Sequence, residues 1–152
     1  MSFRISTKSF IVDKDNRLLI LKRSEDDVHK PSIWEIPGGR LELGENPIEG
    51  LIRETKEETD LDIDVFEPLA IKHFTRQDKQ KITMIVFLCK ALKSPVLLSQ
   101  EHTHYEWVDV KNAKNRLNEF FYPEIDNYNK HFLKQLKSKG HQGSGKRSFP
   151  KQ

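Results

Sequence analysis

Runs of apolar residues separated by polar segments predict a series of β-strands along this chain. Five runs have the length and residue types of strands. They span residues 6–12, 17–22, 63–70, 81–92 and 106–110. The polar tetrapeptide at 13–16 predicts a turn between the first two strands. The polar stretch 24–32 predicts a loop, and a short extended segment at 34–39 ends in Pro37-Gly38-Gly39.

The clearest helix signals lie between residues 46 and 60. Asn46 is a good N-cap, Pro47 suits the first helical position, and Glu49 stands where a capping box places its acid. Residues with helical spacing predict the buried face of this helix. They are Ile48, Leu51, Ile52, Thr55 and Thr59.

A second helix is predicted over residues 122–137. Its apolar face would consist of Ile125, Tyr128, Phe132, Leu133 and Leu136. Strands interrupted by two helices favour an α/β fold in which a mixed β-sheet is sandwiched between α-helices. We expect one domain over residues 1–138 and a basic, linker-like tail over residues 139–152.

The net charge of +3 is spread unevenly along the 152 residues. From Lys130 onward there are seven Lys or Arg and no acid, which leaves 19 basic and 23 acidic residues before that point, a net charge of −4. A mildly acidic domain argues against nucleic acid as a partner. No apolar run reaches the roughly 20 residues of a membrane helix, and the N-terminal residues do not have the pattern of a signal peptide. The single Cys89 lies in an apolar run and predicts a packed thiol. We therefore expect a cytoplasmic protein without a membrane partner.

Three carboxylates of the first predicted helix fall on one arc, away from its apolar face. They belong to Glu54, Glu57 and Glu58, and Arg53 lies beside them. Like charges at these spacings destabilise a helix by about 0.2–0.5 kcal/mol per pair, unless a cation gathers them. Mg²⁺ prefers such oxygen ligands. Acidic helix faces are commonly only solvated, so the triplet alone does not establish a metal site.

The segment before this helix adds a phosphate-binding character. Glycines at 38, 39 and 44 permit a close approach of the backbone, and a tight loop leading into a helix N-terminus can accept phosphate oxygens. With Glu45, these residues form a longer pattern. The pattern resembles the signature box of the Nudix hydrolases. It consists of Gly39, then Glu45 after five intervening residues, then residues 53–61 after seven more.

The resemblance covers the 23 residues 39–61, and the preceding residues 34–38 also match the family. The order of strands and helices is compatible with the Nudix fold from about residue 3 to 136. One position departs from the family pattern, since Asp60 stands where the family has glycine. Helices often end there in a left-handed residue. Asp tolerates that conformation at a cost of roughly 1 kcal/mol.

The resemblance implies a MutT-like hydrolase that uses Mg²⁺ or Mn²⁺ and water to cleave a nucleoside triphosphate or another nucleoside diphosphate derivative. It implies that the metal ligands are three helix carboxylates and one carbonyl, namely those of Glu54, Glu57, Glu58 and Gly39. Arg53 and Glu45 would form an orienting pair. A carboxylate takes the proton of the attacking water, and Glu54 is the first candidate. Glu101, in the polar stretch 99–106, is its rival and a further candidate metal ligand.

Other candidates would bind the substrate. Gly38 and Gly39 would approach it with their backbones, and Arg23, with Lys22 beside it, ends a strand where similar proteins hold phosphates. For the base, Asn118 could donate a hydrogen bond, and Phe74 or Phe120 could stack on it. All of these side chains also have an ordinary structural explanation.

His102 and His104 are expected to be exposed rather than to bind the metal, since Mg²⁺ prefers oxygen. Marker residues of some family branches are missing from residues 74–79, which disfavours ADP-ribose and dinucleoside polyphosphates as substrates. Two alternatives stay open: removal of pyrophosphate from RNA 5′ ends, and a non-catalytic nucleotide-sensing module. The sequence does not distinguish a monomer from a homodimer.

Overall fold

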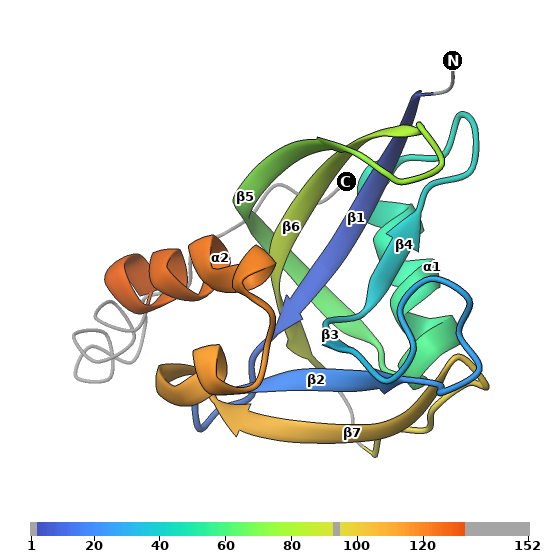
Figure 1. Ribbon diagram of the computed structural model, residues 1–152. Coiled ribbons are helices and arrows are strands. Elements are labelled where there is room, and N and C mark those ends of the chain that lie inside the picture. Colours follow the sequence, from blue (N-terminus) through green and yellow to red (C-terminus); the bar gives the residue numbers. More distant parts are fainter. Residues whose placement is uncertain (1–2, 93–94, 133–152) are drawn as a thin grey trace.

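The computed structural model describes residues 3–92 and 95–132, which build two β-sheets with helices on both sides (Figure 1). The strands are β1 (Phe3–Ile11), β2 (Arg17–Arg23), β3 (Trp34–Glu35), β4 (Gly38–Arg40), β5 (Ile63–Thr75), β6 (Lys81–Ala91) and β7 (His102–Asp109). One sheet has the order β4-β1-β6-β5, and the other has the order β3-β2-β7. In the first sheet β1 and β6 are parallel and the other pairs are antiparallel, so this sheet is mixed.

The helices are α1 (Pro47–Thr59), η1 (Val110–Asn115), η2 (Glu119–Phe121), α2 (Tyr122–Asn127) and η3 (Tyr128–Phe132). Figure 1 shows α1 and α2 on opposite sides of the central strands. This arrangement confirms the predicted α/β fold with a mixed sheet between helices. The second predicted helix is α2 followed by the π-helical turn η3. The rest of that prediction, including Leu133 and Leu136, and the tail at 139–152 lie outside the described residues.

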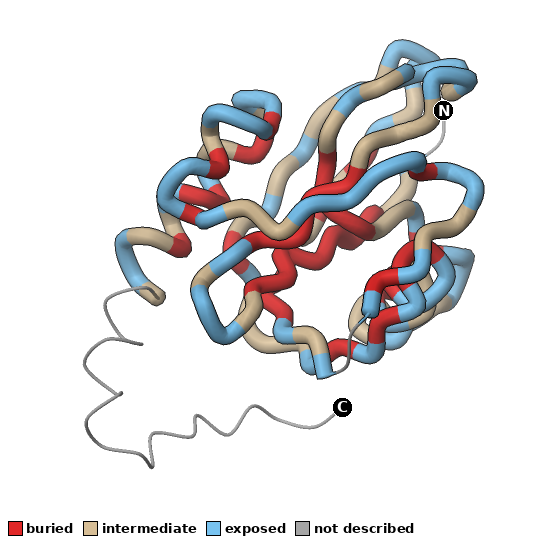
Figure 2. Tube along the Cα trace, turned by 90° about the horizontal axis from the view of Figure 1, so that it is seen from below, coloured by how far each residue is buried: buried red, intermediate tan, exposed pale blue. Residues whose placement is uncertain are grey.

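Two apolar cores cover the two sides of the sheets. Neighbouring residues of one strand enter different cores, because side chains alternate across a strand. Phe10 of β1 packs in the core on the α2 side, whereas Ile11 packs in the core on the α1 side. Figure 2 shows these buried strand segments passing through the centre of the fold. Cys89 is buried in the α1-side core and its pKa lies well above the ordinary value, which confirms the predicted packed thiol.

Helix α1 begins and ends as its sequence predicts. The Asn46 side chain accepts hydrogen bonds from the N–H groups of Ile48 (2.9 Å) and Glu49 (3.2 Å). At the other end, Asp60 adopts a left-handed φ of 61°, and its N–H donates to the Lys56 carbonyl at 2.9 Å. The aspartate therefore occupies the conformation that suits glycine best.

The buried face of α1 differs from the prediction at two positions. Leu51, Thr55 and Thr59 are buried as expected, but Ile52 is 39% exposed. Glu58 is 4% exposed, although its carboxylate was expected to lie away from the buried face. A residue seven positions further along an α-helix points in nearly the same direction. Glu58 therefore lies on the same buried side of the helix as Leu51, whereas Ile52 lies at the edge of that side.

Two substitutions of Asp60 separate the strain of the helix end from the Lys56–Asp60 ion pair (3.5 Å). Asp60→Gly and Asp60→Ala both remove the ion pair, but only glycine adopts the positive φ without strain. We expect Asp60→Gly to be about 1 kcal/mol more stable than Asp60→Ala in urea unfolding. Equal stabilities would contradict a strained helix end.

Candidate active site

Two glycines bring the backbone of β4 against carboxylates of α1. Gly38 has φ +133°, and a Cβ there would lie 2.1 Å from the Thr7 carbonyl oxygen. Its N–H instead donates to the Glu58 carboxylate at 3.1 Å. A Cβ on Gly39 would lie 3.2 Å from the Glu54 carboxyl carbon. Gly38 thus allows β4 to lie close against β1, and Gly39 leaves room for the Glu54 carboxylate.

Arg53 organises the exposed side of α1. Its guanidinium binds Glu45 through two bonds, Nε–Oε2 at 2.7 Å and Nη2–Oε1 at 2.9 Å. The remaining nitrogen, Nη1, lies 3.3 Å from Glu54 and 3.2 Å from Glu57. The Arg53 hydrogen bond, together with one from the backbone N–H of Glu42, lowers the pKa of Glu45 to about 2. The structure thus brings together the residues of the predicted orienting pair and two of the predicted metal ligands.

Glu54 and Glu57 differ in their surroundings. Glu54 is partly buried, and burial raises its pKa although the Arg53 charge opposes this. The negative charges of Glu57 and Glu101 raise it further. Glu57 is exposed and reaches Arg53 from the neighbouring turn of the helix.

Glu58 is the most deeply buried carboxylate of the group. Burial raises its pKa to about 8, despite the opposing charge of Lys8 and the Gly38 N–H. The negative charges of Glu35 and Glu101 act in the same direction as burial. In the absence of a bound cation, this carboxyl group therefore keeps its proton near neutral pH.

Sequence reasoning missed a buried charged network centred on Glu35. The Lys8 ammonium lies 3.3 Å from Glu35 Oε1, and Arg23 Nη1 lies 2.6 Å from Oε2. His102 Nε2 lies 2.8 Å from the same Oε2. Burial favours the neutral form of Glu35, but Lys8, His102 and Arg23 together hold its pKa below the ordinary value. A lysine in the middle of the predicted strand 6–12 was the available signal, because a buried ammonium needs a partner.

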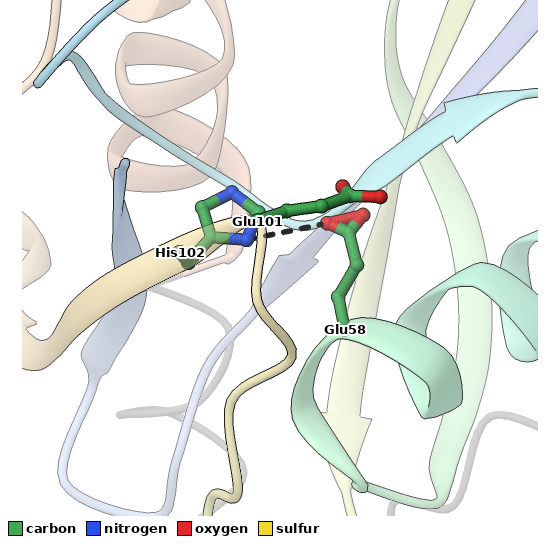
Figure 3. Close-up of side chains that lie close together, drawn as sticks. All are labelled: Glu58, Glu101 and His102. Carbon is green, nitrogen blue, oxygen red and sulfur yellow. Dashed lines mark ion pairs between the residues drawn. The ribbon is translucent and has the colours of Figure 1, made fainter. Parts of the chain in front are cut away.

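The expectation that His102 is exposed is wrong, since this residue is only 3% exposed. The strand β7 begins at His102, not at the predicted residue 106, and pairs with Arg23 of β2 across a bulge. The His102 ring therefore lies between Glu35 and Glu58. Figure 3 shows the side of the ring that faces Glu58. His104 is exposed as expected.

Glu101 lies beside this histidine and points toward Glu58 (Figure 3). One ligand atom from each of Glu58, Glu101 and His102 lies within 4.8 Å of the others. The negative charge of Glu101 also raises the pKa of Glu54, so the Glu54 carboxylate interacts with this group of residues.

The predicted substrate residues lie in two places. Arg23 binds Asp27 (2.6 Å) as well as Glu35, and lowers the pKa of Asp27 to about 2. Phe74 packs edge-on against Phe120 with ring centroids 5.3 Å apart, and Asn118 caps η2 by accepting the Phe120 N–H at 2.8 Å. This aromatic group packs on the α2-side core, whereas the carboxylates of α1 lie on the other side.

Comparison with known proteins identifies the family. The NUDIX domain model matches residues 2–131. A MutT-like protein of Streptomyces ambofaciens is 33% identical over 118 residues, which cover 77% of this chain and 71% of the relative. The asymmetrical bis(5′-nucleosyl)-tetraphosphatase of Mus musculus is 30% identical over 118 residues, covering 72% and 77%. The chain therefore belongs to the Nudix hydrolase family, whose members act on nucleoside diphosphate derivatives.

Solved structures agree with this assignment. The MutT protein of Methanosarcina mazei superposes with a TM-score of 0.75 at 27% identity, covering 85% of this chain and 94% of that one. A C. elegans Ap4A hydrolase gives a TM-score of 0.74 at 21% identity, covering 87% and 98%, which supports the fold alone. Within the described residues, no helix is both long enough and apolar enough to traverse a lipid bilayer.

The raised pKa of Glu58 predicts a particular dependence of stability on pH. Between its ordinary pKa of 4.5 and about 8, the folded state holds a proton that the unfolded state has released. Stability must therefore fall as pH rises through this window. Glu58→Gln removes that loss, so we expect the variant to gain a few kcal/mol relative to wild type between pH 5 and pH 8. Urea unfolding in EDTA measures the difference.

Glu49→Gln is the matched control, since Glu49 is exposed on the same helix. It should follow the wild-type pH dependence. Parallel curves for wild type and Glu58→Gln would contradict the raised pKa.

Proposed function

We propose that this protein hydrolyses the pyrophosphate linkage of a nucleoside triphosphate or another nucleoside diphosphate derivative, with Mg²⁺ or Mn²⁺, in the cytoplasm. The observation that carries the proposal is the convergence of Glu54, Glu58 and Glu101 beside the glycine backbone of β4. Such a group of carboxylates suits a cation that also binds phosphate oxygens.

The residues present fit a divalent cation. Glu54 and Glu58 both have raised pKa values without one, and Gly39 leaves open the space next to Glu54. The ligands in this proposal are the carboxylates of Glu54, Glu57, Glu58 and Glu101, with the Gly39 carbonyl. When bound, the metal supplies positive charge that offsets the charge of the diphosphate and makes water a better nucleophile.

Two carboxylates are candidates for accepting the proton of the attacking water. Glu54 is favoured because a raised pKa brings a carboxylate closer to neutral pH, where a general base is most effective. Arg53, anchored by Glu45, would fix the orientation of Glu54. Glu101 is the alternative candidate, because it is exposed and lies beside Glu58.

The substrate is proposed at the level of a class. Relatives bear names as different as bis(5′-nucleosyl)-tetraphosphatase, ADP-ribose pyrophosphatase and dihydroneopterin triphosphate diphosphatase. In this proposal Gly38 and Gly39 approach the phosphates and Arg23 contributes positive charge. Phe74 and Asn118 are not assigned to the base, because they pack on the α2 side, away from the α1 carboxylates. For Arg23 this requires part of its binding to Asp27 to be exchanged for the substrate.

A substrate panel tests the proposed reaction. Nucleoside triphosphates, ADP-ribose, a dinucleoside tetraphosphate and a 5′-triphosphorylated RNA are incubated with Mg²⁺ or Mn²⁺. We expect release of a nucleoside monophosphate together with pyrophosphate or the residual phosphorylated group. Turnover confined to the RNA, with a steep dependence on salt, would favour the RNA alternative. Binding without turnover on any compound would favour a sensing module.

Substitutions of these carboxylates test the assigned roles. Glu54→Gln, Glu57→Gln and Glu101→Gln should each lower kcat, and loss of the proton acceptor should cost about 10²-fold or more. Glu49→Gln, on the same helix, should retain wild-type turnover because Glu49 lies in the first turn of α1 and is not among the proposed metal ligands. Equal losses for Glu49→Gln and Glu57→Gln would contradict the assigned arc of metal ligands.

A further inference from the structure

One nitrogen of His102 is buried without a partner. Its side chain is completely buried, and Nδ1 makes no hydrogen bond. Nδ1 points toward Glu58, with its Oε2 at 3.9 Å, and the Glu101 carboxylate lies beside both (Figure 3). A buried polar atom without a partner costs about 1–3 kcal/mol, so this arrangement calls for a ligand.

The other ring nitrogen determines what that ligand can be. Nε2 lies 2.8 Å from Glu35 Oε2, and Glu35 also binds Lys8 and Arg23, so its carboxylate is ionised and can only accept. Nε2 therefore carries the hydrogen. In the neutral ring, Nδ1 then presents a lone pair toward two carboxylates. A cation bound between this nitrogen and the two carboxyl groups, in place of the Glu58 proton, would satisfy all three.

We propose that His102 Nδ1 binds a divalent transition-metal ion together with Glu58 and Glu101, and that this nitrogen makes the site prefer Mn²⁺ and its heavier neighbours to Mg²⁺. This inference rests on the proposed metal-dependent function. Imidazole suits transition metals, whereas Mg²⁺ takes oxygen ligands. A histidine ligand characteristically donates its second N–H to a carboxylate, which is the position of Glu35.

The spacing of the ligand atoms agrees with a shared ion. With bonds of about 2.1 Å, two ligand atoms on one ion lie about 3–4 Å apart, depending on the angle between them. The 3.9 Å between Nδ1 and Glu58 Oε2 falls in this range. Burial of His102 also prevents its ring from turning away toward solvent.

Pulsed electron paramagnetic resonance of the Mn²⁺-loaded full-length protein tests the nitrogen ligand directly. We expect the echo envelope to show modulation by a coordinated ¹⁴N, and the pattern to change when the wild-type protein is labelled with ¹⁵N-histidine. This measurement needs no variant, so it does not depend on the folding of a mutant. Wild-type protein without histidine nitrogen modulation would overturn the proposal.

Two matched variants assign the signal. His102→Gln removes Nδ1 but can place an amide N–H near Glu35, and His104→Gln changes the exposed neighbour. We expect the nitrogen modulation to disappear in His102→Gln and to persist in His104→Gln. Persistence in His102→Gln would overturn the assignment.

Metal titration by calorimetry tests the preference. His102→Gln should weaken Mn²⁺ binding at least about 10-fold and Mg²⁺ binding much less. An equal loss for both ions would indicate that His102 only supports the fold, and would overturn the proposal. Turnover of the nucleotide panel separates this inference from the proposed function. Hydrolysis without nitrogen coordination contradicts only this inference. Nitrogen coordination without hydrolysis contradicts only the proposed function.

Discussion

The buried Glu35 carboxylate binds side chains that are far apart in the sequence. It accepts from Lys8 of β1 in one sheet and from Arg23 and His102 of β2 and β7 in the other. Removing one partner of such a group leaves a charge buried without compensation, which typically costs 3–5 kcal/mol. The two sheets therefore keep a fixed relation exactly where the carboxylates of α1 meet the start of β7.

The chemistry of the site follows from this fixed relation. With β7 held against Glu35, Glu101 lies beside Glu58, and burial separates the properties of otherwise similar acids. Arg53 lowers the pKa of Glu45 to about 2, whereas burial raises the pKa of Glu58 to about 8. Helix α1 and the loop before it thus carry carboxylates that differ widely in their affinity for protons.

Local signals predicted α1 well and could not predict its surroundings. The cap at Asn46 and the left-handed end at Asp60 depend on nearby backbone groups, so the local sequence is sufficient to predict both ends of the helix. The burial of Glu58 and His102 depends on partners far along the chain, which no periodicity contains. A pattern of apolar residues would place Ile52 inside and Glu58 outside, because it cannot anticipate a carboxylate buried by a neighbouring strand. The start of β7 was missed because its pairing with Arg23 passes through a bulge.

The parallel pairing of β1 with β6 has a consequence for folding. Residue 3 pairs with residue 81, so the central sheet closes only after most of the chain is available. Such long-range closure is slow, whereas a capped helix such as α1 forms from neighbouring residues. In the proposed metal site, Glu58 and His102 come together only when β7 is in place, so a cation would meet its complete set of ligands only in the finished fold.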